Sequence, residues 1–183
     1  PPEAEISGIE FALKLIEKYK IFGKICHVST LEGLHKIIRA KKRGVMVTAE
    51  VAPHHLYFHQ NNKNLQVNPP IRSAEDCMGL IKSLKRGEID FLATDHAPHT
   101  REEKAEGISG MPHLDTYGPF VTWLMAEQEL TPKDIARVCS ENPGKFWREF
   151  TGEKYGKYGK IEEGYTGSLT ILDMHKPILI KKD

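Results

Sequence analysis

Three polar residues of types that bind metals or move protons lie at the ends of short apolar segments. His27 ends the apolar part of KICHV (24–28), His54 follows VTAEVA (47–52), and Asp95 follows FLAT (91–94). Apolar segments of this length are typical of buried strands. The carboxyl ends of parallel strands open on one face of an α/β protein, where binding and catalytic groups collect. We therefore expect these three side chains to converge.

The three side chains have the chemistry of a catalytic zinc site. Neutral imidazole and carboxylate both bind zinc, and a catalytic zinc keeps one position for water. Water on the metal ionises near neutral pH, which provides a nucleophile without a strong base. A nearby cation keeps Asp95 ionised, so this residue is suited to bind the metal, to accept the proton of the attacking water, or to do both.

Each of these residues also has an ordinary structural explanation. Taken alone, His27 is more often a hydrogen-bonded core histidine than a ligand, and Asp95 is also suited to cap the segment after it. His55 and His59 are equally suited to support a ligand or to face solvent. Adjacent side chains tend to point apart, which favours His54 over His55 only slightly.

The residues around Asp95 and in one proline-rich loop are further candidates. His96 is placed to orient a ligand, and His99 lies one proline-stiffened turn later, where it suits an anionic substrate or plain exposure to solvent. The segment NPPIR (68–72) is usually a rigid turn, so a role for Asn68 needs independent support. No catalytic role is expected for the remaining histidines, namely His35, His113 and His175.

Helical and strand patterns alternate through the first hundred residues. Apolar residues recur at helical spacing in the segments 6–16, 31–43 and 74–86. Thr30 and Ser73 are expected N-caps, and Gly44 and Gly87 are expected helix stops. Helices that alternate with apolar strands favour a parallel sheet with right-handed crossovers, either doubly wound or closed into a barrel. Periodicity alone does not choose between these two.

The later part of the chain is expected to be helical and then to change character. One helix is predicted near 116–129, and TPKD (131–134) begins another, with Thr131 as its cap. The dipeptide Asn142–Pro143 is expected to end that helix. From Tyr155 onward, Gly-rich sequence and short apolar runs favour strands and turns rather than another helix.

Composition excludes several classes of function. Lys and Arg number 26 against 25 Asp and Glu, so the net charge of +1 provides no field that would attract nucleic acid or an anionic membrane. No apolar run reaches the ~18 residues of a membrane helix. The three cysteines predict no disulfide framework and favour a reducing cytoplasm. Phosphate-binding loops and serine-hydrolase elbows are absent, so nucleotide-phosphate binding and serine-hydrolase chemistry have no motif behind them. The near-zero net charge makes a small molecule or another protein the expected partner.

Four motifs in order resemble those of dihydroorotases, members of the amidohydrolase superfamily, of the class I type. They are ICHVST (25–30), AEVAPHHL (49–56), NPPIR (68–72) and ATDHAPHTREEK (93–104). The resemblance extends from about Ile21 to the end, through GISGMPHLDTYGPF, ENPGKFW and GKIEEGYTGSLTILD. Each motif is weak alone, whereas four in order are specific.

The resemblance implies an activity and a set of roles. The activity is the zinc-dependent, reversible cyclisation of N-carbamoyl-L-aspartate to L-dihydroorotate in pyrimidine biosynthesis, with two zinc ions in the complete active site. His27 and His54 would be zinc ligands, and Asp95 would be both a zinc ligand and the general acid/base. The implied substrate-binding residues are Asn68, His99 and Gly107. The family's loop often carries a Pro-Phe-Gly whose backbone touches the substrate; KAEGISG stands there in this chain, and Gly107 would retain the backbone contact.

The resemblance also implies the fold and an incomplete site. The implied fold class is α/β, with residues 1–154 as the C-terminal half of a (β/α)8 TIM-type barrel and residues 155–183 as part of a small β domain. The family's HxH pair, the arginine after it and the bridging lysine or aspartate are absent. We therefore expect the N-terminal half of the same enzyme to be supplied by another segment, with an aspartate carbamoyltransferase or a second copy of the enzyme as further partners.

Two alternatives stay open at this point. One is another cyclic amidase of the hydantoinase, dihydropyrimidinase or allantoinase type, although these usually differ at PHH or at the end of the aspartate motif. The other is a catalytically silent scaffold that binds a partner enzyme. Retention of His27, His54 and Asp95 argues against a silent scaffold.

Overall fold

The computed structural model describes residues 1–62 and 65–176. The chain divides into two compact units, Pro1–His113 and Leu114–Asp183, and each is considered separately below. The first unit contains every residue proposed for the site.

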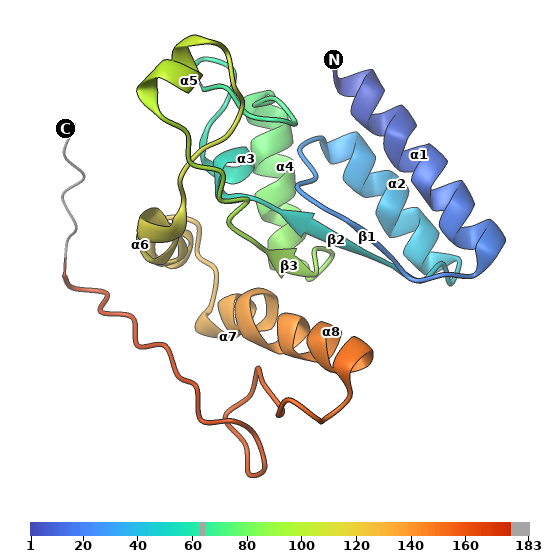
Figure 1. The fold of residues 1–183 in the computed structure, drawn as a ribbon, viewed down its shortest axis with the longest axis vertical. Helices are drawn as coiled ribbons and strands as arrows, with labels where there is room; N and C mark the ends of the chain where they lie inside the picture. The colour runs from blue at the N-terminus through green and yellow to red at the C-terminus, as the bar shows by residue number, and fades with distance from the viewer. Residues whose placement is uncertain (63–64, 177–183) are drawn as a thin grey trace. The chain divides into compact units, whose positions relative to one another are not determined.

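A small parallel sheet lies in the first unit (Figure 1). Its strands are β1 (Gly23–Ile25), β2 (Val47–Val51) and β3 (Phe91–Leu92), in the spatial order β1-β2-β3. The parallel register pairs Gly23 with Val47, Lys24 with Thr48, Ile25 with Ala49, Glu50 with Phe91 and Val51 with Leu92. The predicted α/β class is confirmed, and in the described residues the sheet is small and open.

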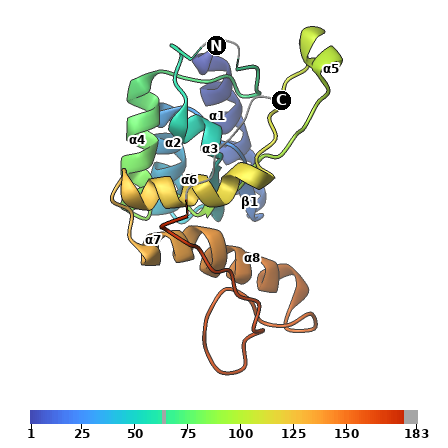
Figure 2. The same cartoon turned by 90° about the vertical axis from the view of Figure 1, so that its left-hand side faces the viewer.

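Three helices cover the sheet and form the core with it (Figures 1 and 2). They are α1 (Pro2–Tyr19), α2 (Leu31–Lys42) and α4 (Ala74–Lys85), and α2 contacts both of the others. Their apolar stripes are buried as the helical spacing predicts. The buried residues include Ile9, Leu13, Ile16, Leu34, Ile37, Leu80 and Leu84.

The predicted helix boundaries are confirmed in the first unit. The side-chain oxygens of Thr30 and Ser73 each accept a hydrogen bond from the backbone N–H three residues later, at 3.2 and 3.1 Å. Gly44 and Gly87 follow the helix ends with φ of 88° and 74°, the left-handed conformation that glycine adopts without a steric penalty. These local rules place β2 and β3 directly after helices.

Two strands are shorter than the apolar segments predicted. β1 ends at Ile25 and β3 ends at Leu92, whereas the sequence patterns extend to Val28 and Asp95. The backbone leaves the extended conformation because His27 and Asp95 have φ of 40° and 49°. A left-handed residue cannot continue a strand, so His27 lies in a bend and Asp95 in an irregular segment just beyond the sheet.

A buried ionic network connects α1 to the loops near the sheet. One Glu5 carboxylate oxygen accepts hydrogen bonds from the backbone N–H groups of Ser29 and Thr30 at 2.9 and 3.1 Å. The other accepts from the Ser29 hydroxyl and from Arg72 Nη2, the latter at 2.9 Å. The Glu5 and Arg72 side chains are only 10% and 9% exposed. The network holds the NPPIR loop against the turn that follows β1.

The second unit is helical where it is regular. It contains α6 (Leu114–Ala126), α7 (Pro132–Ala136), a π-helical turn (Arg137–Glu141) and α8 (Asn142–Thr151). Thr131 caps α7 as predicted, with a reciprocal bond between its backbone N–H and the Asp134 carboxylate.

The expected helix stop at Asn142–Pro143 is wrong. The backbone N–H of Asn142 bonds to the carbonyl of Arg137, five residues earlier, so the helix passes through a π-helical turn and continues as α8. Pro143 then occupies the first turn of α8, directly after the π-helical turn, and the helical run continues past it to Thr151. The proline therefore does not end the helix.

Residues 152–176 contain turns and bends, and none of these described residues forms a strand. The small β domain expected at 155–183 stays a prediction, because part of it lies outside the described residues.

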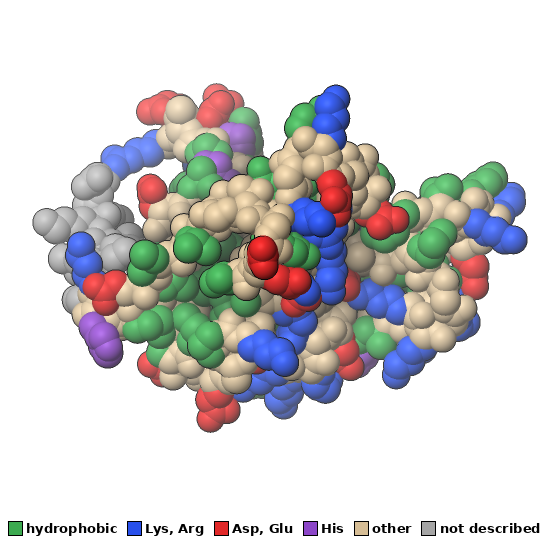
Figure 3. All heavy atoms as spheres, turned by 90° about the horizontal axis from the view of Figure 1, so that it is seen from below, with side chains coloured by type: hydrophobic (Ala, Val, Ile, Leu, Met, Phe, Trp, Pro, Cys, Tyr) green, Lys and Arg blue, Asp and Glu red, His purple; other side chains and the backbone are tan. Residues whose placement is uncertain are grey.

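Figure 3 shows apolar side chains at the surface between Lys and Arg residues. Among the helices of the described residues, none is both long and apolar enough to cross a membrane.

Candidate metal centre

The three predicted ligands all lie beyond the carboxyl ends of adjacent parallel strands. His27 follows β1, Asp95 follows β3, and His54 lies in the short helix α3 (Pro53–Tyr57) directly after β2. Parallel pairing therefore brings residues 27, 54 and 95 to the same edge of the sheet.

His54 and Asp95 form the centre of this arrangement. His54 Nε2 lies 3.7 Å from Asp95 Oδ2, beyond hydrogen-bond distance. The His54 side chain is fully buried and its Nε2 has no hydrogen-bond partner among the described residues. The Asp95 side chain is 33% exposed, so its carboxylate is open to solvent on one side. A buried, unpartnered ring nitrogen thus faces a solvent-accessible carboxylate.

His27 is close enough to this pair to influence it electrostatically. Charge on His27 lowers the pKa values of both His54 and His55. His27 Nδ1 is buried, and no hydrogen-bond partner for it is present in the described part of the chain. A second imidazole nitrogen near the pair is therefore without a protein partner.

His27 and Asp95 also share an unusual backbone conformation. Their φ values of 40° and 49° lie in the left-handed region, which costs a residue with a side chain about 1–2 kcal/mol. Strained residues of this kind cluster at functional sites, where the surrounding structure enforces them. Lys20 and Glu129 also adopt this conformation, with φ of 51° and 55°, so the strain is not restricted to the candidate site.

Burial keeps His54 neutral. Desolvation is the main reason that its pKa falls from 6.5 to about 3, and the nearby His55, His113 and His27 lower it further. An imidazole must be neutral to bind a metal. His54 is therefore in the metal-binding protonation state throughout the physiological pH range.

His55 has a different environment from His54, although both are buried. Its Nε2 lies 2.9 Å from the carbonyl oxygen of Pro69, so this ring supports the NPPIR loop. Burial lowers its pKa to about 4, against the opposing effects of the Pro69 hydrogen bond and of the Glu5 and Asp95 charges. The two adjacent histidines thus point to different partners, and only His54 faces Asp95.

The predicted substrate residues lie in loops outside this pair. Asn68 is exposed, and His99 Nδ1 lies 3.4 Å from Glu103 Oε2 at the start of α5 (Arg101–Ala105). The Gly107 carbonyl accepts a 2.6 Å bond from Gln66 Nε2. No contact described here joins these residues to His54 or Asp95, so their substrate roles stay predictions.

Gly110, rather than Gly107, lies against His99. A methyl group at Gly110 would come within 2.5 Å of the Ala97 carbonyl and 2.9 Å of His99 Cδ2, and its φ is 146°. Glycine at this position allows the two loops to approach closely. The motif GISG gives a weak sequence signal for such a contact.

His113 is the site residue that the sequence did not reveal. Its side chain is buried, its Nε2 lies 2.9 Å from His54 Nδ1, and the two rings stack with centroids 5.0 Å apart. The backbone N–H of His113 donates to His96 Nδ1 at 3.0 Å. His113 follows a proline in an irregular segment with no periodic pattern, so only the tertiary structure indicates its position.

These donors fit part of a metal site. Within the described residues, no three side chains of His, Cys, Asp or Glu are grouped closely enough to hold an ion. The open nitrogens of His54 and His27 and the carboxylate of Asp95 are nevertheless the ligand types that zinc takes. Within the described residues the arrangement is therefore a partial donor set.

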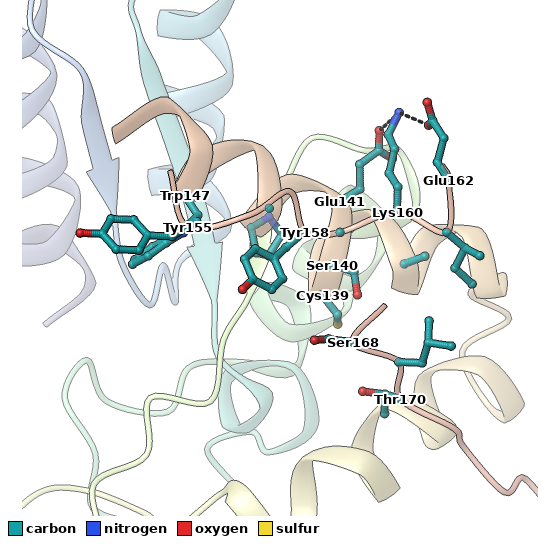
Figure 4. Close-up of a pocket in the computed structure, with 16 residues that line it drawn as sticks. Cys139, Ser140, Glu141, Trp147, Tyr155, Tyr158, Lys160, Glu162, Ser168 and Thr170 are labelled. Carbon is teal, nitrogen blue, oxygen red and sulfur yellow. Dashed lines mark ion pairs between the residues drawn. The ribbon is translucent and has the colours of Figure 1, made fainter. Parts of the chain in front are cut away.

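The second unit contains a separate hollow (Figure 4). Its volume is about 1050 Å³, and Trp147, Tyr155 and Tyr158 line one side of it. Lys160 lies between Glu141 and Glu162, 3.9 Å from an oxygen of each. None of the residues predicted for catalysis lines this hollow.

Curated proteins similar in sequence are dihydroorotases. The dihydroorotase of Brevibacillus brevis is 36% identical over an alignment of 185 positions, gaps included. The alignment covers 95% of this chain and 42% of the relative. That of Clostridium botulinum is 38% identical over 157 residues, covering 85% of this chain and 38% of the relative. The resemblance to dihydroorotases is confirmed, and the chain spans about two fifths of these relatives' length. No protein-family model matches the chain.

Solved structures with a similar fold are amidohydrolases. The L-hydantoinase (dihydropyrimidinase) of Arthrobacter aurescens aligns with a TM-score of 0.82 and 28% identity, over 90% of this chain and 38% of that chain. The dihydroorotase of Saccharomyces cerevisiae, solved with 5-fluoroorotic acid, aligns with a TM-score of 0.69 and 19% identity, over 76% of this chain and 42% of that chain. The chain therefore has an α/β fold similar to that of TIM-barrel amidohydrolases.

Proposed function

We propose that this chain is part of a dihydroorotase, a metal-dependent cyclic amide hydrolase that interconverts N-carbamoyl-L-aspartate and L-dihydroorotate in pyrimidine biosynthesis. The observation that carries the proposal is the buried, unpartnered Nε2 of His54, which faces Asp95 across 3.7 Å at the strand ends. Sequence identity of 36–38% to dihydroorotases over most of the chain supports the same activity.

Zinc is the proposed metal, with two ions in the complete active site. His27, His54 and Asp95 would hold it together with ligands from the rest of the protein. When bound, zinc would activate water and polarise the amide carbonyl of the substrate. The low pKa of His54 supports this role. The ring is neutral at pH 7, so zinc does not have to displace a proton from a charged imidazolium.

Asp95 is the proposed general acid/base. During ring opening its carboxylate would accept a proton from the attacking water and then return that proton to the leaving amide nitrogen. In ring closure the same steps run in reverse. Its partial exposure supports this role, because a carboxylate that exchanges protons with substrate must be reachable from the substrate side.

Asn68, His99 and Gly107 are the proposed substrate-binding residues. His99 would contact the substrate carboxylate, and Glu103, whose Oε2 lies 3.4 Å from His99 Nδ1, would help to orient the imidazole for that contact. Asn68 lies in the NPPIR loop, which the His55–Pro69 and Glu5–Arg72 bonds hold in place. Gly107 would contribute a backbone group.

Residues 1–154 are proposed to be the C-terminal half of a (β/α)8 barrel, and residues 155–183 the start of a small β domain. The open parallel sheet supports this proposal, since its edge strands need further strands to pair with. Large exposed apolar side chains late in the chain offer surface for the rest of the protein, namely Trp147, Phe150, Tyr155, Ile161, Leu169 and Ile171.

An aspartate carbamoyltransferase or a second copy of the enzyme is the proposed further partner. The proposed compartment is the cytoplasm.

A hydantoinase-type activity is the second candidate. The TM-score of 0.82 with the L-hydantoinase favours it, whereas the sequence relatives favour dihydroorotase. The two activities differ in their substrates, since dihydroorotate carries the carboxylate that His99 is proposed to bind and hydantoin does not. Assays with dihydroorotate and with hydantoin, on the same preparation, distinguish them.

The test is to measure zinc content and ring closure of carbamoyl aspartate with the complete protein and with an Asp95→Asn variant. Loss of a general acid/base costs about 100- to 10,000-fold in turnover, so the variant is expected to lose at least that much. Asp173→Asn, which changes an exposed aspartate in the C-terminal segment, is the matched control. Near-normal turnover by Asp95→Asn would contradict the assignment.

A further inference from the structure

The ring of His113 contacts the side of His54 that does not face Asp95. His54 Nδ1 lies 2.9 Å from His113 Nε2, while His54 Nε2 has no hydrogen-bond partner and faces the Asp95 carboxylate. The two rings are nearly parallel, at 21°, and both are buried. His113 is therefore in position to control which nitrogen of His54 is open.

A neutral imidazole carries one proton, and the position of that proton decides which nitrogen has a free lone pair. Burial disfavours charge on either ring, so the short contact between the two nitrogens holds a single proton as a hydrogen bond. If His54 donates from Nδ1, its Nε2 lone pair is free and directed toward Asp95. If His113 donated instead, His54 Nε2 would carry a buried N–H at a distance from Asp95 too long for a hydrogen bond.

The backbone of His113 and the segment before it are bonded to the residues that directly follow Asp95. His96 Nδ1 accepts the His113 backbone N–H at 3.0 Å, and the Ala97 N–H donates to the Met111 carbonyl at 3.0 Å. Residues 96 and 111 also form a parallel bridge. These bonds join the segment before His113 to the residues directly after Asp95, so the His113 ring and the Asp95 carboxylate belong to one local assembly.

We infer that His113 is a positioning residue that accepts the Nδ1 proton of His54 and thereby holds the His54 Nε2 lone pair toward Asp95. His96 supports this arrangement by holding the backbone of His113. The inference rests on the proposed function, because it assigns His113 to a metal ligand. It gives roles to His96, which directly follows Asp95 in the sequence, and to His113, which lies outside the four ordered motifs.

The experiment compares two substitutions at residue 113 in the complete protein. His113→Leu fills a similar volume without an acceptor, whereas His113→Gln can present an amide oxygen to His54 Nδ1. Zinc affinity is measured by competition with a chromogenic chelator, and the ring nitrogens of His54 are observed by ¹⁵N NMR in the zinc-loaded protein. Thermal unfolding of the metal-free variants reports any general loss of packing.

Loss of a hydrogen-bond partner behind a metal-binding histidine lowers metal affinity about 10- to 100-fold. We expect that loss in His113→Leu, with recovery in His113→Gln and with the Nδ1 proton signal of His54 changed only in the leucine variant. Equal affinities in all three proteins, or equal losses in both variants, would overturn the inference and leave the proposed function standing. A wild-type protein that binds no zinc would overturn both.

Discussion

Glu5 and Arg72 form an ion pair with an Oε2–Nη2 distance of 2.9 Å, and both side chains are about nine-tenths buried. Sixty-seven residues separate them in the sequence, and the pair joins the first turns of α1 to the end of the NPPIR loop. Arg72 Nε also donates to the Ser29 hydroxyl, which donates to Glu5. The turn after β1, the loop that contains Asn68 and the N-terminal helix are therefore coupled through one carboxylate.

Glu5→Gln is expected to destabilise the protein by about 2–4 kcal/mol, because it leaves Arg72 buried without its counter-charge. The free energy of unfolding in urea, measured at pH 7, checks the value. Glu3→Gln changes an exposed glutamate of the same helix and is expected to alter it by less than about 0.5 kcal/mol. Equal effects of the two substitutions would mean that the Glu5 network contributes little.

The same carboxylate predicts a pH dependence. Burial tends to raise the pKa of Glu5, but hydrogen bonds from Ser29, Arg72 and Thr30 together hold it below the usual 4.5. A lowered folded-state pKa stabilises the fold above the unfolded-state pKa, and that contribution is lost as the pH falls through the folded-state value. The stability difference between wild type and Glu5→Gln should therefore be constant from pH 7 to about 5 and shrink below about 4.5.

The two adjacent histidines predict different consequences of substitution. Loss of a residue that only hydrogen-bonds to a metal ligand lowers metal affinity about 10- to 100-fold. His54→Gln should weaken zinc binding by more than this, because it removes a proposed ligand itself. His55→Gln should have a smaller effect on zinc affinity, since His55 bonds to the Pro69 carbonyl. Chelator competition with both variants of the complete protein measures the difference. A larger loss in His55→Gln would reverse the assignment of the PHH motif.

Gly110→Ala is expected to destabilise the protein by about 1–3 kcal/mol, because its φ of 146° is strained for alanine and its methyl group would overlap the Ala97 carbonyl. The displaced His99 should raise KM for the carboxylate-bearing substrate. Gly118→Ala, in α6 with nothing within 4 Å of the added methyl group, should instead stabilise by about 0.5–1 kcal/mol. Urea unfolding and steady-state kinetics test both expectations.

Local features of the fold were predictable from the sequence. Thr30, Ser73 and Thr131 act as caps because capping depends on a side chain and a backbone group three residues apart. The parallel sheet followed from the alternation of helices and strands. The error at Pro143 arose because a π-helical turn, which the sequence does not signal, places that proline in a first turn.

The candidate site was predictable only in part. Strand ends indicated His27, His54 and Asp95, because their positions depend on sheet topology. The left-handed φ of His27 and Asp95 depends on surrounding contacts and carries no signal in the residue type. The partnership of His113 with His54 links positions 59 residues apart, and no local rule predicts such a contact.

The left-handed conformation of His27 and Asp95 has a consequence for protein engineering. Glycine would relax the backbone at either position, so Asp95→Gly should fold more stably than Asp95→Ala by about 1 kcal/mol. The same substitution removes the carboxylate. Selection for stability at these two positions would therefore favour glycine, whereas the proposed chemistry requires a side chain at both.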